Sequence, residues 1–422
     1  MKRYRWVVLG LMVMLTFINY IDRASLSIVA PMIMKEFTLS PSEMGVIFSG
    51  FFMSYALFCF VGGYVSDIYG PKKTISIAIV FWSLFAAAPA VAWGFVSLLI
   101  FRVIFGAGEG PVSSVTNKMI NNWFPATERA KAKGITDTGM SLGAAVAGPI
   151  VGFIAIAYGW RISFVCLSVM GIAWSLLWHK MVTDLPKDHP KVSPEELKEI
   201  EVGKITESQF SEKLPLSYYI KQPIILVTVV AFFATNYATY FFLTWFPTYL
   251  VMAHNLTIKN MAIVSVIPWL FGALGYSLGG FISDYLVKKL GDLVLARKLV
   301  ISVCLAGAAV SIACCGIVTT TAAAVTLMSF GIFFAYLATP SYWAIIQDTV
   351  KSNSVGRVGG FVHFLSNTAG IFAPSITGYT VQTSGSFSGA FFLTGGLAIS
   401  GAILVALFAK PIRGFVVPNI KS

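Results

Sequence analysis

Apolar stretches of about 20 residues recur along the whole chain, and this repetition limits the folds that are open to it. One α-helix needs roughly 20 apolar residues to cross the hydrocarbon core of a bilayer. Inside lipid the backbone polar groups must be satisfied within the protein, which leaves only helices or a closed barrel. Because the apolar runs are continuous rather than alternating, they exclude the barrel. The sequence therefore predicts a polytopic α-helical membrane protein.

Composition supports this class, because only 11% of the 422 residues are charged while 57% are hydrophobic. A soluble domain carries about a quarter charged residues, so this chain cannot present an ordinary water-facing surface. We expect twelve transmembrane spans, at residues 7–29, 44–65, 74–94, 96–118, 134–156, 162–181, 223–250, 261–286, 299–317, 321–346, 357–380 and 387–409.

The net charge of +12 is distributed unevenly around these spans. Most of the 30 Lys and Arg residues fall at the chain ends or in loops on one side, whereas Lys35, Arg161 and Lys259 lie on the other. The positive-inside rule places both termini and the long middle loop in the cytoplasm. The excess charge therefore orients the protein next to anionic lipid, and nucleic-acid binding is a poor explanation for it.

No residue pattern indicates catalysis or a bound metal. The five cysteines lie within predicted spans, without metal-ligand spacing, and are expected to pack as small apolar side chains. No nucleophile–base pair or phosphate-binding loop is visible, and Gly106-x-Gly108-x-Gly110 is predicted to pack helices rather than bind a dinucleotide. We expect neither an enzyme nor a cofactor, with a proton gradient as the driving force.

A polar, proline-containing segment at 182–221 interrupts the hydrophobic pattern. It divides the chain into an N-terminal six-helix bundle (1–181), a linker (182–221) and a C-terminal six-helix bundle (222–422). Within the linker, Ser193 as N-cap, Pro194 at the first helical position and an acidic first turn predict a short helix over 194–201.

The two bundles share a sequence repeat. Gly62-Gly63-Tyr64-Val65-Ser66-Asp67 recurs as Gly279-Gly280-Phe281-Ile282-Ser283-Asp284, 217 positions later, and the same shift carries Asn19-Tyr20 onto Asn236-Tyr237. One common offset indicates duplication. Parallel repeats with a substrate site between them are the organisation of major facilitator transporters, which this arrangement resembles.

The loop after the second span carries the pattern Gly63-x-x-x-Asp67-x-x-Gly70-x-Lys72-Lys73. It resembles the signature gating loop of the major facilitator superfamily, and Gly280, Asp284, Arg297 and Lys298 repeat part of it. The alternative is an ordinary positively charged loop.

Two pairs of charged residues stand out within the predicted spans: Asp22 and Arg23 near the end of the first, and Arg102 and Glu109 in the fourth. Lys118 also lies within the fourth span. Ionised groups at this depth are costly, so they face the bundle interior or a water-filled cavity and pair there. Asp22 and Arg23 project about 100° apart on a helix, and Arg102 and Glu109 lie about 10 Å apart along one face. We therefore expect different partners for Asp22 and Arg23, and we expect Arg102 and Glu109 to flank one cavity without forming a direct ion pair. Asp22 and Glu109 are candidates for reversible protonation, although all four charges could simply hold helices together.

Five segments in order resemble the anion:cation symporter family, which includes bacterial glucarate, galactarate, galactonate and hexuronate permeases and the animal sialin and vesicular glutamate carriers. They are Asn19-Tyr20-Ile21-Asp22-Arg23-Ala24-Ser25-Leu26-Ser27, Arg102-x-x-x-Gly106-x-x-Glu109-x-Pro111, Asn121-x-Trp123-Phe124-Pro125-x-x-Glu128-Arg129-Ala130, Asp188-His189-Pro190-Lys191-Val192-Ser193-x-Glu195-Glu196-Leu197 and Phe241-Phe242-Leu243-Thr244-Trp245-Phe246-Pro247-x-Tyr249-Leu250.

The resemblance implies that Arg23 binds the substrate carboxylate, that Asp22 and Glu109 carry protons, and that Arg102 tunes Glu109. Tyr20, Tyr55 and Asn117 match cavity positions in the first half, and Trp343 matches one in the second. Met140, Tyr342 and His363 depart from the galactonate-like pattern. His363 could relay protons, contact substrate or pack, and Gln347 and Asn367 are polar candidates with helix–helix bonding as the alternative.

We therefore expect a proton-coupled symporter that imports a sugar acid of the hexonate, hexarate or hexuronate type by alternating access. An organic-anion exchanger or uniporter and a transporter-like ligand sensor are the alternatives. The expected partners are a small carboxylate, protons and the lipid bilayer, with the protein a monomer in the cell membrane, which for a bacterium is the inner membrane.

Overall fold

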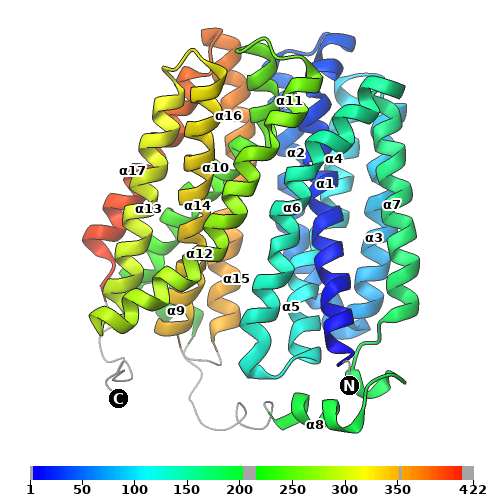
Figure 1. Cartoon of the computed structure of the whole chain (residues 1–422), viewed down its shortest axis with the longest axis vertical. Helices are drawn as coiled ribbons and strands as arrows, with labels where there is room; N and C mark the ends of the chain where they lie inside the picture. The colour runs from blue at the N-terminus through cyan, green and yellow to red at the C-terminus, as the bar shows by residue number, and fades with distance from the viewer. Residues whose placement is uncertain (1–2, 203–214, 351–353, 411–422) are drawn as a thin grey trace. The chain divides into compact units, whose positions relative to one another are not determined.

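The computed structural model describes residues 3–202, 215–350 and 354–410, and these residues are helical with no strand among them (Figure 1). Residues 203–214, which belong to the predicted linker, and 411–422 lie outside the described residues. The helices are α1 (Arg5–Glu36), α2 (Pro41–Tyr69), α3 (Pro71–Ala87), η1 (Ala88–Val91), α4 (Phe95–Glu109), α5 (Pro111–Trp123), α6 (Ala126–Tyr158), α7 (Trp160–Met181), η2 (Pro186–Asp188), α8 (Pro194–Val202), α9 (Leu216–Tyr219), α10 (Pro223–Met252), α11 (Ile258–Val264), α12 (Val266–Leu290), α13 (Leu293–Cys315), α14 (Thr321–Thr349), α15 (Val355–Asn367), α16 (Ala369–Ser384) and α17 (Ser388–Phe408).

The described residues contain eleven helical segments that are long and apolar enough to cross a membrane. The remaining predicted span, 357–380, is not one continuous helix, because α15 ends at Asn367 and α16 begins at Ala369. Ser366, Asn367 and Thr368 all donate side-chain hydrogen bonds to backbone carbonyls of the preceding turn. Such bonds compete with the helical ladder at this turn.

Two compact units make up the chain, Met1–Leu39 with Gly50–Phe210 (unit 1) and Ser40–Ser49 with Ser211–Ser422 (unit 2). The three-segment division at 181 and 222 stays a prediction. The repeated Gly-Gly-x-x-Ser-Asp sequence lies near the end of α2 in unit 1 and near the end of α12 in unit 2. In unit 1, α1 packs on α6 and α3 on α7; in unit 2, α14 packs on α12 and α13.

The glycine run of α4 packs helices, as predicted. A Cβ at Gly106 would overlap the backbone oxygen of Phe51, and one at Gly108 would lie 3.1 Å from the Cα of Trp82. Glycine therefore lets α4 approach α2 and α3 closely, which matters because α4 ends at Glu109. Pro111 cannot donate a backbone hydrogen bond, so the helix is interrupted directly after this acid.

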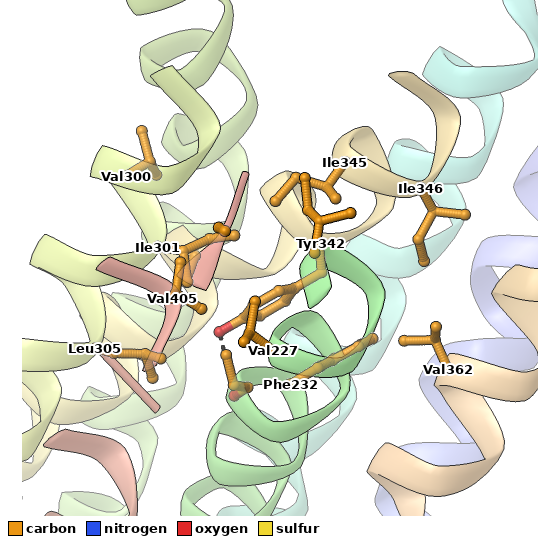
Figure 2. Close-up of a cluster of buried hydrophobic side chains, with 14 of the residues drawn as sticks. Val227, Phe232, Val300, Ile301, Leu305, Tyr342, Ile345, Ile346, Val362 and Val405 are labelled. Atoms are coloured by element: carbon orange, nitrogen blue, oxygen red, sulfur yellow. Dashed lines mark hydrogen bonds between the residues drawn. The ribbon is translucent and has the colours of Figure 1, made fainter. Parts of the chain in front are cut away.

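Unit 2 is built around a buried apolar cluster that α10, α13, α14, α15 and α17 share (Figure 2). Tyr342 is fully buried among these side chains, and its hydroxyl forms a hydrogen bond of 2.8 Å with the Thr235 hydroxyl. The Tyr342 hydroxyl is therefore satisfied within the core.

Residues 181–199, which follow α7, fasten the starts of several helices of unit 1, and we name this segment the clasp. The carboxylate of Glu196, on α8, accepts hydrogen bonds from the backbone N–H groups of Tyr4 (2.9 Å) and Arg5 (3.0 Å) in the first turn of α1. Arg5 is 1% exposed and forms ion pairs with Glu128 of α6 and Glu199 of α8. Figure 1 shows α8 beside the N-terminal end of α1.

The same segment holds α3 and α5. The Asp184 carboxylate accepts a hydrogen bond of 2.7 Å from the backbone N–H of Lys72 at the start of α3. Asn122 and Trp123 of α5 donate to the backbone carbonyls of Asp184 and Thr183. Gly70 has φ of 85°, and a Cβ there would lie 2.8 Å from the Asp184 carboxylate, so both conformation and space require glycine.

We predict that Glu196→Ala lowers the free energy of unfolding by about 2 kcal/mol, because two first-turn N–H groups lose a charged acceptor. Thermal unfolding of the purified protein measures this. Glu201→Ala is the matched control, since Glu201 is exposed on the same helix. Equal stability of the two variants contradicts the clasp.

The stability of the clasp should depend on pH because of His189. The ring of His189 stacks on Tyr4 with centroids 4.1 Å apart and packs edge-on against Trp123. Burial, together with the charges of Lys191 and Lys72, lowers the pKa of His189 below its usual value. The undocked imidazole therefore binds a proton more readily than the docked one. The clasp is fully stable above the usual histidine pKa of about 6.5 and weakens as the pH falls below it.

We predict that acidification from about pH 8 to about pH 5.5, across the usual histidine range, lowers the thermal stability of the native protein more than that of His189→Phe. The phenylalanine ring keeps the stacking surface and cannot take up a proton. Thermal melts of both proteins at matched pH values make the comparison, and parallel pH profiles would argue against a role for His189.

Candidate functional site

Arg23 of α1 and Glu109 of α4 form a buried ion pair within unit 1. The Nη2 and Nε atoms of Arg23 lie 3.0 and 3.2 Å from Oε2 of Glu109. The exposed fractions of the two side chains are 3% and 0%. Arg23 also donates to Oδ1 of Asn19, one turn earlier on α1. One carboxylate oxygen thus receives two charge-assisted hydrogen bonds, and the guanidinium is held on both sides.

Aromatic rings surround the same guanidinium. Its Cζ atom lies 4.5 Å from the ring centroid of Tyr55, 4.8 Å from that of Tyr20 and 5.1 Å from that of Phe51. The structure therefore brings the predicted residues Tyr20 and Tyr55 together with Arg23. Phe51 was not predicted, although its position one helical turn before Tyr55 places it on the same face.

Asp22 and Arg23 have different partners, as predicted from their angular separation. Oδ2 of Asp22 accepts a hydrogen bond of 3.2 Å from Nε1 of Trp82, on α3. Arg102 lies over the rings of Phe51 and Phe105 and forms no ion pair with any acid in the described part of the chain. Trp82 is a site residue that sequence reasoning missed, since a tryptophan within an apolar span carries no distinguishing pattern.

Four buried polar atoms around this cluster have no hydrogen-bond partner among the described residues: Asn19 Nδ2, Asp22 Oδ1, Arg102 Nε and Glu109 Oε1. Buried polar groups are normally paired, so unpaired donors and acceptors gathered around three ionisable side chains are unusual. Each carboxyl of this cluster has one oxygen held by the protein and one able to take a proton or a ligand hydrogen bond.

Two other positions of unit 1 that the family resemblance singled out are not part of this cluster. Asn117 is exposed on α5, and Met140 is partly buried on α6. Their roles stay predictions.

In unit 2, the rings of Trp343 and His363 lie 5.6 Å apart, and Phe232 contacts both. The Asn367 amide is occupied by the protein, since it donates to the His363 carbonyl at 2.7 Å and accepts from the Tyr240 hydroxyl. Gln347 is exposed, one turn beyond Trp343 on α14.

Tyr342, one of the departures from the galactonate-like pattern, lies in the core of unit 2, where its side chain is 0% exposed and its hydroxyl is bonded to Thr235.

The predicted gating loop has different ionic partners in the two units. Asp67 pairs with Lys118 of α5, whose ammonium also donates to the Ser66 carbonyl. Lys118 was seen only as a charge within a span, so this partner was missed. Gly63 leaves room beside Ser114, and Lys73 lies over the ring of Tyr69.

In unit 2 the equivalent acid, Asp284, pairs with Arg297 at 2.7 Å. Arg297 also contacts Asp348 at 3.3 Å and donates to the Ser283 hydroxyl. The Arg297 side chain is 10% exposed, compared with 30% for Lys118. The second loop is therefore tied by a more buried cation with more partners.

We predict that Arg297→Met destabilises the protein more than Lys118→Met, because removing a buried cation leaves two acids uncompensated, whereas an exposed pair contributes about 1 kcal/mol or less. Thermal unfolding of both variants tests this order. Adding Asp67→Asn to Lys118→Met should lower the stability little further. A larger loss of stability for Lys118→Met than for Arg297→Met would contradict the prediction that the Arg297 pair contributes more.

The geometry defines a multi-pass helical membrane protein with a charged, buried site in one unit. Residues 12–374 match the sequence model of the Major Facilitator Superfamily. The chain belongs to the major facilitator superfamily, whose members are membrane transporters, and it is not an enzyme.

Similar proteins support this family assignment. The chain is 50% identical to the "Hexuronate transporter" of Bacillus subtilis (strain 168) over 94% of this chain and 93% of the relative. It is 34% identical to the "Probable galactarate/D-glucarate transporter GarP" of Escherichia coli (strain K12), over 99% and 95%. Among solved structures, the inward open conformation of the xylose transporter XylE from E. coli has a TM-score of 0.76 at 15% identity, covering 98% of each chain, and shows the same fold.

Proposed function

We propose that this protein imports a hexuronate or a closely related sugar acid together with protons, by alternating access. The observation that carries the proposal is the Arg23–Glu109 ion pair, buried within the membrane-spanning part of unit 1. The similarity to relatives named as hexuronate and galactarate/D-glucarate transporters supports the substrate class.

The carboxylates of Glu109 and of the substrate compete for the same cation, Arg23. A guanidinium fork suits bidentate capture of a carboxylate, and in this structure the fork is occupied by Glu109. A proton on Glu109 removes the charge that holds Arg23. The freed fork can then bind the carboxylate of the substrate, so proton uptake and anion binding occur together.

The energetics favour this coupling. Leaving a buried cation without its anion costs about 3–5 kcal/mol, which favours the states in which Arg23 holds one of its two anions. Asp22 supplies a second protonation site, because its Oδ1 atom has no hydrogen-bond partner among the described residues. Arg102, whose guanidinium lies over the Phe51 ring as that of Arg23 does, supplies a second positive charge in this cluster and tunes Glu109.

The proposal also includes the oligomeric state, the membrane and the orientation of the protein. The protein is a monomer of the cell membrane, the inner membrane in a bacterium, with both termini in the cytoplasm. The one-sided distribution of Lys and Arg supports this orientation. The proton gradient supplies the driving force, without a cofactor.

Purified protein in liposomes should take up labelled glucuronate in response to an inward proton gradient. We predict that Glu109→Gln, a permanently neutral form, abolishes the gradient dependence while retaining exchange of glucuronate across the membrane. Arg23→Lys should raise the KM about tenfold or more, because the ammonium loses the bidentate geometry.

Glu36→Gln is the control, because this acid lies on α1 but pairs with Arg161 at the far end of the helix. Gradient-independent exchange by the native protein would identify an exchanger or uniporter instead. Normal gradient-driven uptake by Glu109→Gln would remove the proposed coupling.

A further inference from the structure

Unit 2 contains a groove between the starts of two membrane-spanning segments, Ile258–Leu290 and Thr321–Thr349. Its volume is about 480 Å³, and we name it the apolar groove. One wall is formed by Val264, Ile267 and Phe271, and the other by Ala322, Val325 and Phe330. Val325 lies at the base and is 6% exposed, whereas Ile267 and Phe330 at the rim are 44% and 43% exposed. The groove is therefore open along its outer side.

Glycines on α12 determine where this helix touches α14. A Cβ on Gly275 would overlap the backbone oxygen of Phe333, 58 positions later, and the next glycine of α12 repeats this contact with the same offset. The two helices therefore run side by side in parallel. The same offset places Ile267 level with Val325, and no glycine lies within residues 258–271. The backbones cannot approach as closely at this level, which leaves the groove between them.

Both ends of the groove are bounded. Toward the middle of the spans, the rings of Phe271 and Phe330 meet edge to face with centroids 5.8 Å apart. Toward the other end, the first span is interrupted, since α11 ends at Val264 and α12 begins at Val266. Pro268 has no backbone N–H to donate to the Val264 carbonyl one turn earlier. The groove thus has a defined length.

This length is close to the depth of one leaflet. The lining residues 322–330 of α14 cover about 12 Å along the helix, at about 1.5 Å per residue. Half of a hydrocarbon core about 30 Å thick is about 15 Å. Because the groove begins in the first turn of α14, it runs from one end of the span toward its centre.

The walls offer little to a polar occupant, because the surface of the groove is almost entirely apolar. The Ser329 hydroxyl, which also lines it, donates to the Val325 carbonyl at 2.7 Å and is satisfied within its own helix. A buried water needs about two to four polar partners, and each hydroxyl that a sugar acid buries needs a partner too. Hydrocarbon is therefore the chemistry that matches the groove.

The surface beside the groove identifies the source of that hydrocarbon. Ile267, Leu270 and Leu274 are exposed, and their spacing places them on one face of α12. In a membrane-spanning helix such an apolar face contacts lipid, and Ile267 belongs both to this face and to the rim of the groove. A second helix fits less well, since two turns that are about 10 Å across fill roughly 850 Å³. The acyl chains of the bilayer are the matching occupant.

We propose that the apolar groove binds one acyl chain of a membrane phospholipid, which fills the space between the first turns of α12 and α14. The chain belongs to the leaflet at the α13–α14 turn, which faces away from the cytoplasm in the orientation proposed above. Walls without partner atoms lose their dispersion contacts on one side, so the bound chain stabilises unit 2. The proposal needs only the membrane location and does not depend on the substrate or on proton coupling.

Photolabelling of the native protein in vesicles tests this site. The vesicles contain phosphatidylethanolamine and phosphatidylglycerol, with a small fraction of phosphatidylcholine that carries a diazirine in the middle of one acyl chain. After irradiation and digestion, mass spectrometry should find about fivefold or more adducts per residue on 264–271 and 322–330 than on 303–310 of α13. The reference segment includes Val303 and Val310, two exposed apolar side chains of the same unit.

Equal or weaker labelling of the groove overturns the proposal, whether a second copy of the chain or the protein's own side chains then fill the space.

A variant that fills the groove gives a second comparison. Ala322→Phe places a ring between the walls and should lower the labelling of 264–271 to the level of the α13 segment. Val310→Phe adds the same ring at an exposed position of α13 and should leave the groove labelling unchanged. Thr326→Phe replaces Ala322→Phe if that variant does not fold, since Thr326 is exposed and also lines the groove.

Groove labelling that persists in a folded groove-filling variant contradicts the proposal, and if neither variant folds, the labelling of the native protein decides.

Failure of the lipid site and failure of the proposed function give different results, because the labelling requires no transport. A protein that is labelled in the groove but takes up no sugar acid keeps the lipid site and loses the proposed function. Gradient-driven uptake of glucuronate with even labelling of all exposed apolar faces removes the lipid site alone.

Discussion

The Arg23–Glu109 ion pair is the interaction on which the arrangement of unit 1 depends. Ionised side chains at membrane depth are costly unless they are paired and face the protein interior. Keeping this pair together requires α1 and α4 to stay in register, and the rings of α2 that cover the guanidinium require the third helix. The close packing at Gly106 is the backbone counterpart of that requirement. The pair also makes the site reactive, because one proton on Glu109 changes the balance of charges around Arg23.

Much of this architecture could be predicted from the sequence because it depends on local patterns of residue type and spacing. Hydropathy located the spans, since crossing a bilayer demands a minimum apolar length. The intramembrane charges were conspicuous for the same reason, and helical geometry correctly separated Asp22 from Arg23. The cap at Ser193 is confirmed, because its hydroxyl accepts the Glu196 N–H. The break at Thr368 was missed, since the hydropathy of 357–380 does not record where one helix ends and the next begins.

The remaining features depend on contacts between distant positions, which no local pattern reveals. Glu196 reads in the sequence as the acidic first turn of its own helix, but its carboxylate serves the first turn of α1. Lys118 and Trp82 gain their importance only from the acids that they meet across the bundle. Tyr342, noted in the sequence only as a departure from the galactonate-like pattern, lies in the core, bonded to Thr235. In each case the sequence showed the residue type but not the distant residue that it contacts.

The clasp also has a consequence for the order in which the protein can be made. The first N–H groups of α1 are satisfied by a carboxylate at position 196, so the start of the chain cannot be completed until the segment after α7 has been synthesised. Once that segment has docked, the described part of unit 1 has the ends of α1, α3, α5 and α6 fastened. Domains generally fold as units during synthesis, N-terminal first. The clasp can thus form only after the chain has been made as far as residue 199, which makes it a late step in the folding of unit 1.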